Sequence, residues 1–187
     1  MTHPPPEALR WQVNGERTLY DNPWVRLTQV AVTTPDGQQF WHHVIRLQTV
    51  AAALVLDEHD RVLMLWRHRF VPDTFAWELP GGIVTADETG VETARREAEE
   101  ETGWRPGGTG ERLISFQPMP GMVDTPHEVY VFRGADQIGK PTDAEEAGRV
   151  AWLPTSDLLA LARQGELAGS GSLVGVLYLL ASRGTQD

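Results

Sequence analysis

Over its first 80 residues the chain alternates short apolar runs with polar turns, a pattern typical of β-structure. Two segments rich in Val, Thr, Trp and Phe, residues 24–34 and 38–47, are separated by a Pro-Asp-Gly turn signal at 35–37. We therefore expect an N-terminal β-hairpin over about residues 20–48. The strands expected next, each an apolar or β-branched run between turn residues, are 50–56, 61–66 and 76–79.

After residue 82 the period of the apolar positions changes from two residues to 3.6, which predicts a helix over 90–102. Thr89 with a glutamate three residues later predicts a capping box, and Gly103 predicts a left-handed end. The elements expected beyond are strands at 112–117, 128–132 and 149–153 and helices at 155–163 and 169–181. Strands on both sides of a central helix, with a helical pair at the end, predict an α/β sandwich around a mixed β-sheet.

Composition, net charge and the length of the apolar runs exclude several classes of protein. The 187 residues suit a single domain, 1–187, and 26 acidic against 16 basic residues give a net charge of −10. Without a basic surplus, a nucleic-acid polymer is a poor partner. The absence of cysteine excludes disulfides, cysteine nucleophiles and iron–sulfur clusters. No apolar run approaches the ~18 residues of a membrane span, so we expect no membrane association and a cytoplasmic protein.

Half of the charge imbalance lies in residues 87–101, where seven carboxylates accompany two arginines, a net of −5. Glu97, Glu100 and Glu101 stand at i, i+3 and i+4 and so share one helix face. On a solvated face their repulsion costs only a few tenths of a kcal/mol per pair, and the pattern needs no further explanation. In a groove of effective dielectric ~20 each pair costs about 3 kcal/mol, which calls for a cation such as Mg²⁺ or Mn²⁺.

The residues around these glutamates decide between the two interpretations. From 82 to 104 the chain reads Gly, five residues, Glu, seven residues, Arg-Glu-Ala, one residue, Glu-Glu, one residue, Gly-Trp. This spacing follows Glu-Leu-Pro-Gly at 78–81, and it resembles the Nudix box, so the chain is similar to Nudix hydrolases. The resemblance implies a Nudix-type α/β/α sandwich around a mixed β-sheet.

The resemblance also implies a metal site. Glu97, Glu100 and Glu101, together with the carbonyl of Gly81, would coordinate Mg²⁺, with Mn²⁺ as a substitute. Arg96 would shape the site, because it can pair with a carboxylate one helical turn away or with Glu88 across the preceding loop. Glycines at 81 and 82 would let the backbone approach a charged ligand closely.

Hydrolysis of a pyrophosphate bond needs a base, and two sources are open. One is Glu97 itself, and the other is the acidic loop at 143–146, from which relatives of the ADP-ribose pyrophosphatase type often draw a glutamate. Glu146 is preferred there over Glu145. The alternative interpretation of this loop is a solvated surface turn.

Outside the box the chain is most similar to the ADP-ribose and ADP-sugar pyrophosphatase branch. Arg67 and Arg69, which follow a strand, would bind substrate phosphates, unless they are ordinary surface arginines. Glu78 is also expected to contact the substrate. Trp41 would stack on the base, unless it is a core or interface residue. In this branch the N-terminal strands build a homodimer, which we expect here as well.

The resulting expectation is Mg²⁺-dependent hydrolysis of a small phosphorylated nucleotide, a nucleoside diphosphate linked to another moiety, with ADP-ribose or another ADP-sugar as the preferred substrate. The alternatives are a CDP-alcohol, a nucleoside triphosphate, or a Nudix-fold module that senses a nucleotide without cutting it. Because Glu97, Glu100 and Glu101 are all present, hydrolysis is favoured over sensing.

Overall fold

The computed structural model describes residues 7–142 and 148–184. The chain divides into two compact units. The first comprises Met1–Gln48 and Gln117–Thr125, and the second comprises Thr49–Phe116 and Pro126–Asp187. Each unit contains its own β-sheet, and residues 82–104, whose spacing resembles the Nudix box, fall within the second.

The first unit is a four-stranded sheet in the order β1-β2-β3-β10. Its elements are η1 (Glu7–Leu9), β1 (Gln12–Asp21), β2 (Arg26–Thr33), β3 (Gln39–Arg46) and β10 (Val123–Asp124). The expected N-terminal hairpin is confirmed, since β2 and β3 pair antiparallel from Arg26–Arg46 to Thr33–Gln39. β1 was not expected from the pattern. All ten of its residues are exposed, so it carries no alternation of buried and exposed positions.

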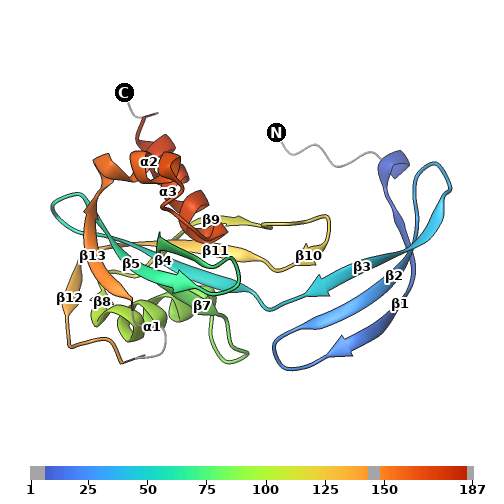
Figure 1. Cartoon of the computed structure of the whole chain (residues 1–187), viewed down its shortest axis with the longest axis horizontal. Helices are drawn as coiled ribbons and strands as arrows, with labels where there is room; N and C mark the ends of the chain where they lie inside the picture. The colour runs from blue at the N-terminus through green and yellow to red at the C-terminus, as the bar shows by residue number, and fades with distance from the viewer. Residues whose placement is uncertain (1–6, 143–147, 185–187) are drawn as a thin grey trace. The chain divides into compact units, whose positions relative to one another are not determined.

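The second unit is built on a seven-stranded sheet in the order β13-β5-β4-β11-β9, with β6 paired to β5 and β7 to β4 (Figure 1). Its strands are β4 (Val50–Leu56), β5 (Arg61–Arg69), β6 (Thr74–Glu78), β7 (Gly81–Ile83), β9 (Glu111–Phe116), β11 (His127–Arg133) and β13 (Arg149–Pro154). Two short strands, β8 (Trp104–Pro106) and β12 (Ala135–Gln137), pair separately. β4 and β11 run parallel and the other pairs antiparallel, so the expected mixed sheet is confirmed.

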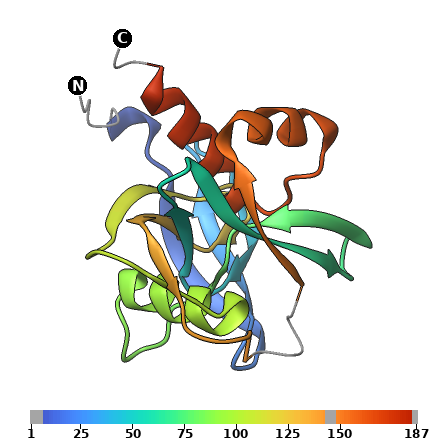
Figure 2. The same ribbon diagram turned by 90° about the vertical axis from the view of Figure 1, so that its left-hand side faces the viewer.

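Helices cover both faces of this sheet (Figures 1 and 2). On one face, α1 (Gly90–Thr102) buries Ala94 and Ala98 in a core cluster with alternate residues of β4. On the other, α2 (Thr155–Gln164) and α3 (Ser170–Arg183) pack on the remaining residues of β4 and on β11. The α/β/α sandwich is therefore confirmed. No helix in the described ranges is long and apolar enough to cross a membrane.

Local signals fix α1 at both ends. The Thr89 side chain accepts a hydrogen bond from the Glu92 amide, and the Glu92 carboxylate accepts one from the Thr89 amide, as the capping box predicts. Gly103 ends the helix with φ 74°, and its amide donates to the Glu99 carbonyl. The helix that presents the acidic side chains thus begins and ends where the sequence predicts.

The segment before α1 differs from the expected loop. Gly81–Ile83 forms β7, which pairs antiparallel with the first residues of β4. A Cβ on Gly81 would lie 2.5 Å from the Ala51 carbonyl oxygen and 2.7 Å from the Ala52 Cα, so the close approach of the two strands requires glycine here. β7 thereby holds the Gly-Gly backbone against the central strand, beside α1.

Candidate active site

Arg96 gathers the carboxylates at the exposed side of α1. Its Nε and Nη2 donate to Glu88 at 2.8 and 3.0 Å, and its Nη1 donates at 2.9 Å to both Glu97 and Glu100. Hydrogen bonds from this guanidinium lower the pKa of Glu88 to about 2, and the hydrogen bonds that Arg96 donates to Glu88 and the other two carboxylates raise its own pKa. One positive charge faces three negative ones, so the cluster carries a net charge of −2.

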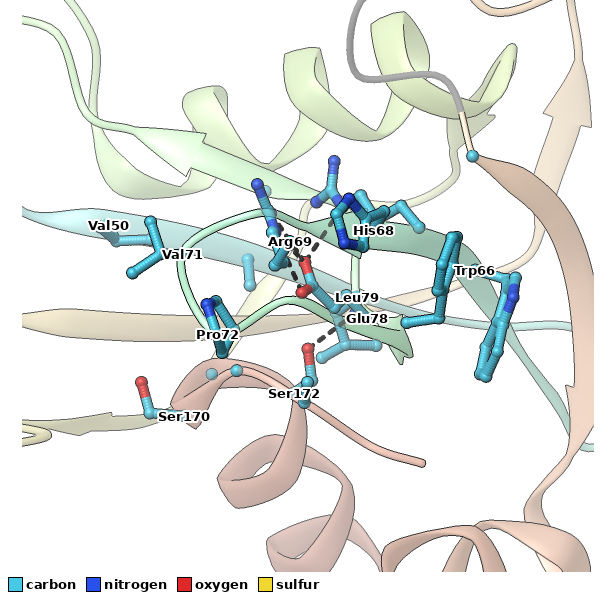
Figure 3. A pocket seen from close by; sticks show the side chains of 18 of the residues that line it. Val50, Trp66, His68, Arg69, Val71, Pro72, Glu78, Leu79, Ser170 and Ser172 are labelled. Carbon is cyan, nitrogen blue, oxygen red and sulfur yellow. Dashed lines mark hydrogen bonds and ion pairs between the residues drawn. The ribbon is translucent and has the colours of Figure 1, made fainter. Parts of the chain in front are cut away.

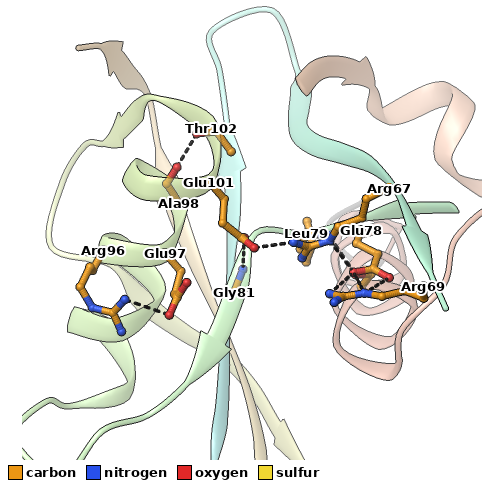
Figure 4. A network of polar contacts seen from close by, with 11 residues as sticks. Arg67, Arg69, Glu78, Leu79, Gly81, Arg96, Glu97, Ala98, Glu101 and Thr102 are labelled. Atoms are coloured by element: carbon orange, nitrogen blue, oxygen red, sulfur yellow. Dashed lines mark hydrogen bonds and ion pairs between the residues drawn. The ribbon is translucent and has the colours of Figure 1, made fainter. Parts of the chain in front are cut away.

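Glu101 points the other way, into the protein (Figure 4). Its side chain is 2% exposed, ion-pairs with Arg67 and accepts a hydrogen bond from the Gly81 amide at 2.9 Å. Arg67, itself buried, also donates to Glu78 at 3.0 Å. The pKa of Arg67 is raised despite its burial, because both partners are carboxylates. This network ties α1 to β5, β6 and the Gly-Gly backbone.

Arg69 lies at the end of β5 and is only partly buried. Its Nε and Nη2 both donate to the buried carboxylate of Glu78, at 2.7 to 3.1 Å, which fixes the plane of the guanidinium. Its Nη1 has no partner among the described residues. Arg69 therefore presents a fixed cation with an available donor.

Two cavities meet at Arg69. The first, the α1 cavity, is about 750 Å³ and is lined by Val50, Arg69, Gly81, Gly82, Ile83, Thr85, Asp87, Glu88, Arg96, Glu97 and Glu100. The second, the hairpin cavity, is about 1110 Å³ and lies between the β5–β6 hairpin, residues 66–75, and the start of α3, residues 168–172 (Figure 3). Val50, Arg69 and Gly81 line both, so the cavities are neighbours around the start of β4.

The α1 cavity suits a divalent cation by its donor chemistry. Asp87, Glu88, Glu97 and Glu100 supply hard carboxylate oxygens, the ligands preferred by Mg²⁺ and Mn²⁺. Within the described ranges no three acidic or histidine side chains are grouped closely enough to hold a metal as they stand, and Arg96 ion-pairs with both Glu97 and Glu100. A bound divalent cation would supply the positive charge that Arg96 now supplies. The carboxylate oxygens that would bind it already line the α1 cavity.

The expected site residues separate into three places. Gly81, Arg96, Glu97 and Glu100 line the α1 cavity, Arg69 lies where both cavities meet, and Arg67, Glu78 and Glu101 form the buried network beside them. Trp41 belongs to the first unit, on β3, where the Arg17 guanidinium lies 4.7 Å from its ring centre. Glu145 and Glu146 lie outside the described residues.

The hairpin cavity was not expected from the sequence. Its walls come from segments about 100 residues apart, and only the tertiary fold brings them together. The signals were present separately: an aromatic-rich stretch at 66–75 and the Gly-Ser-Gly-Ser run at 169–172, which reads simply as a helix start.

Comparisons with known proteins agree with this geometry. A NUDIX domain model matches residues 46–170, more than half of the chain. The chain is 42% identical over 179 residues to the CMP-5′-(N-acetyl-N-hydroxy-3-aminopropyl)phosphonate hydrolase of Streptomyces rubellomurinus, covering 96% of this chain and 86% of that protein. It is 28% identical to the ADP-ribose pyrophosphatase of Mycobacterium tuberculosis, covering 89% and 82%.

A solved structure described as an ADP compounds hydrolase superposes with a TM-score of 0.80 at 13% identity, covering 95% of this chain and 96% of that one. At this identity the likeness shows the fold alone. The family to which these matches point generally uses a divalent metal such as Mg²⁺. Taken with the box spacing on β7 and α1, the comparisons show that the chain belongs to the Nudix family and is a Nudix hydrolase.

Proposed function

We propose that the α1 cavity hydrolyses the phosphoanhydride bond of a nucleoside 5′-phosphate joined to a second phosphoryl or phosphonyl group. The observation that carries this proposal is the acidic cluster of Glu88, Glu97 and Glu100, gathered by one arginine in a cavity that also contains Arg69. Carboxylates attract a cation and repel phosphates, whereas Arg69 attracts phosphates. The two together suit a diphosphate that arrives with a metal.

Different residues of the site would bind the metal and the substrate phosphate. Glu97 and Glu100 would hold Mg²⁺, for which Mn²⁺ can substitute, together with the Gly81 carbonyl and with Glu101, whose carboxylate does not line the cavity but already contacts the Gly81 backbone. The cation, when bound, neutralises phosphate oxygens and acidifies the attacking water. Arg69 would bind a phosphate through its available Nη1, while Glu78 keeps the guanidinium oriented. Arg67 anchors Glu101 and Glu78.

In the reaction, a water oxygen forms a bond to one phosphorus and the bond from that phosphorus to the bridging oxygen breaks. The bridging oxygen leaves with the other phosphoryl group, and the base takes the proton of water. Glu97 lines the cavity and is one candidate for the base. Glu146, or its neighbour Glu145, is the other.

Two substrate types are supported. The 42% identity over almost the whole chain favours a CMP-linked phosphonate or a similar cytidine compound. Relatives named as ADP-ribose or ADP-sugar pyrophosphatases, at 22–28% identity, favour ADP-ribose or another ADP-sugar, the substrate expected from the sequence. Both contain the same P–O–P linkage, so the proposed chemistry does not depend on which is correct.

The test is a product analysis across a substrate panel. Purified protein is incubated with CMP-phosphonates, CDP-alcohols, ADP-ribose, ADP-sugars and nucleoside triphosphates, with Mg²⁺ or Mn²⁺, and products are identified by ³¹P NMR. We expect release of CMP or AMP from at least one diphosphate-type compound and none after chelation of the metal. Failure to cleave any phosphoanhydride with either metal would favour the nucleotide-sensing module instead.

We also propose an oligomeric state for the protein. Three exposed tryptophans are spread over the first unit: Trp11, 50% exposed, precedes β1; Trp24, 70% exposed, lies in the β1–β2 turn; and Trp41, 47% exposed, lies on β3. Such a surface suits an interface with a second copy, and we infer a homodimer built through this sheet. Light scattering should then give twice the 20.8 kDa chain mass. A monomer at micromolar concentration would contradict this inference.

A further inference from the structure

The hairpin cavity offers a row of aromatic rings beside the α1 cavity. Trp66 and His68 on β5 face Phe75 on β6, with ring centres 6.4 and 4.7 Å from that of Phe75. The Trp66 and Phe75 planes are 20° apart, so they are nearly parallel. Phe75 is nevertheless 61% exposed. These side chains form an aromatic surface that stays open at the rim of a cavity, where a flat aromatic ligand could stack.

The opposite wall is polar. It is formed by the start of α3, where Gly169 precedes the helix without a side-chain cap and Ser170 lines the cavity (Figure 3). Ser172 is buried, and its hydroxyl accepts a hydrogen bond from the Leu79 amide at 2.8 Å, which fixes this wall to the strand that leads into β7. The cavity therefore combines an aromatic wall with a hydroxyl-bearing one, as a nucleoside requires.

The position of Arg69 sets the direction of a bound substrate. Arg69, Val50 and Gly81 line both cavities, so a phosphate at Arg69 lies between them. The phosphoanhydride bond to be cleaved would lie in the α1 cavity, beside the carboxylates that would hold the metal. The group attached to the Arg69-bound phosphate, on the side away from the scissile bond, would then extend into the hairpin cavity.

We propose that the hairpin cavity binds the nucleoside half of the substrate, with the base stacked on the ring row of His68 and Phe75. This assignment rests on the proposed function. The base is the planar part of such a substrate, and stacking needs a π-face. The phosphonyl chains, alcohols and sugars that can form the other half have no aromatic ring. At about 1110 Å³ the cavity is large enough, since small-molecule sites are typically about 300–1,000 Å³.

Binding of reaction products tests the proposal without catalysis. The affinities of CMP, AMP and ribose 5-phosphate are measured by titration calorimetry for the wild type and for Phe75→Ala. Stacking contributes about 1–3 kcal/mol per base, so Phe75→Ala should weaken whichever nucleotide binds by about 5- to 100-fold. The affinity for ribose 5-phosphate, which has no base, should stay unchanged. In turnover assays the same variant should raise KM and leave kcat within a few-fold.

Two further variants sharpen the result. Tyr178→Ala removes an aromatic side chain of α3 that is 45% exposed and lines neither cavity, and it should bind nucleotides as the wild type does. Trp41→Ala removes the aromatic residue that the sequence analysis places near the base. Urea unfolding of all three variants checks that the fold is kept.

Three results would overturn the assignment. They are wild-type nucleotide affinity in folded Phe75→Ala, loss of the base-dependent affinity in Trp41→Ala alone, and a wild type that binds nucleotides no more tightly than ribose 5-phosphate. The proposed function fails in a different way, by the absence of any phosphoanhydride turnover. A hydrolase with normal turnover and an unchanged Phe75→Ala variant would keep the function and reject this nucleoside site.

Discussion

Replacement of Gly82 by alanine probes the contact between β7 and the acidic face of α1. A Cβ at this position would lie 2.6 Å from the Glu97 carboxyl carbon. Ordinary carbon–carbon contact is about 3.5 Å or more, so the carboxyl group must move away by roughly 1 Å. Gly82 has no left-handed φ, and the clash is with the far end of a side chain, so the backbone itself accepts alanine.

The expected effect is therefore on the site and not on the fold. A misplacement of 1 Å can cost about 100-fold in rate, and a disturbed metal ligand about 10- to 100-fold in affinity. We expect Gly82→Ala to lower kcat by about 100-fold and Mn²⁺ affinity, measured without substrate, by at least about 10-fold. The free energy of unfolding should change by less than about 1 kcal/mol, as for alanine at a backbone-compatible glycine.

Two glycines provide controls. Gly121→Ala places its Cβ in open space and should leave rate, Mn²⁺ affinity and stability unchanged. Gly81→Ala would press against the backbone of β4 and should lower the free energy of unfolding by about 1–3 kcal/mol. If Gly82→Ala turned over substrate and bound Mn²⁺ like the wild type, the reasoning that Glu97 holds the metal against this backbone would be refuted.

Two further predictions concern the arginine networks. The folded-state pKa of Glu88 is about 2, below its usual value near 4.5, so its charge stabilises the fold fully above pH 4.5 and progressively less toward pH 2. In urea unfolding without metal, Glu88→Gln should therefore have a lower free energy of unfolding than the wild type at pH 7, and this difference should be smaller at pH 3. An equal difference at both pH values would contradict this. Arg67→Met leaves two buried carboxylates without this cation and should lower the free energy of unfolding by about 3–5 kcal/mol, whereas a loss below about 1 kcal/mol would show that the pairs with Glu78 and Glu101 contribute little.

The parts of the fold that are encoded locally could be predicted from the sequence. α1 begins and ends as expected because a capping box and a left-handed glycine act within a few residues of its ends. β4 matches its expected bounds because both of its faces are buried, which leaves an unbroken apolar run. β1 escaped prediction because it is held by backbone pairing to β2 with every side chain exposed.

The arrangement of the residues expected at the site could not be predicted from the sequence. The sequence places Arg67 and Arg69 together as phosphate ligands, yet Arg67 is buried against Glu101, 34 residues away, while Arg69 keeps an available donor between two cavities. Helical spacing likewise puts Glu97 and Glu101 on one face, but Glu101 turns inward to the Gly81 amide. These orientations depend on which strand packs against each side chain, and a local sequence pattern does not contain this information.

The most direct test of the central claim compares two glutamates of the same helix. Glu97 lines the α1 cavity, whereas Glu99 pairs with Arg105 and lines neither cavity. With Mg²⁺ and the best substrate of the panel, Glu97→Gln should lower kcat by at least about 100-fold with the fold intact, and Glu99→Gln should stay within about twofold of the wild type. Equal turnover by Glu97→Gln and the wild type would contradict the assignment of hydrolysis to the α1 cavity.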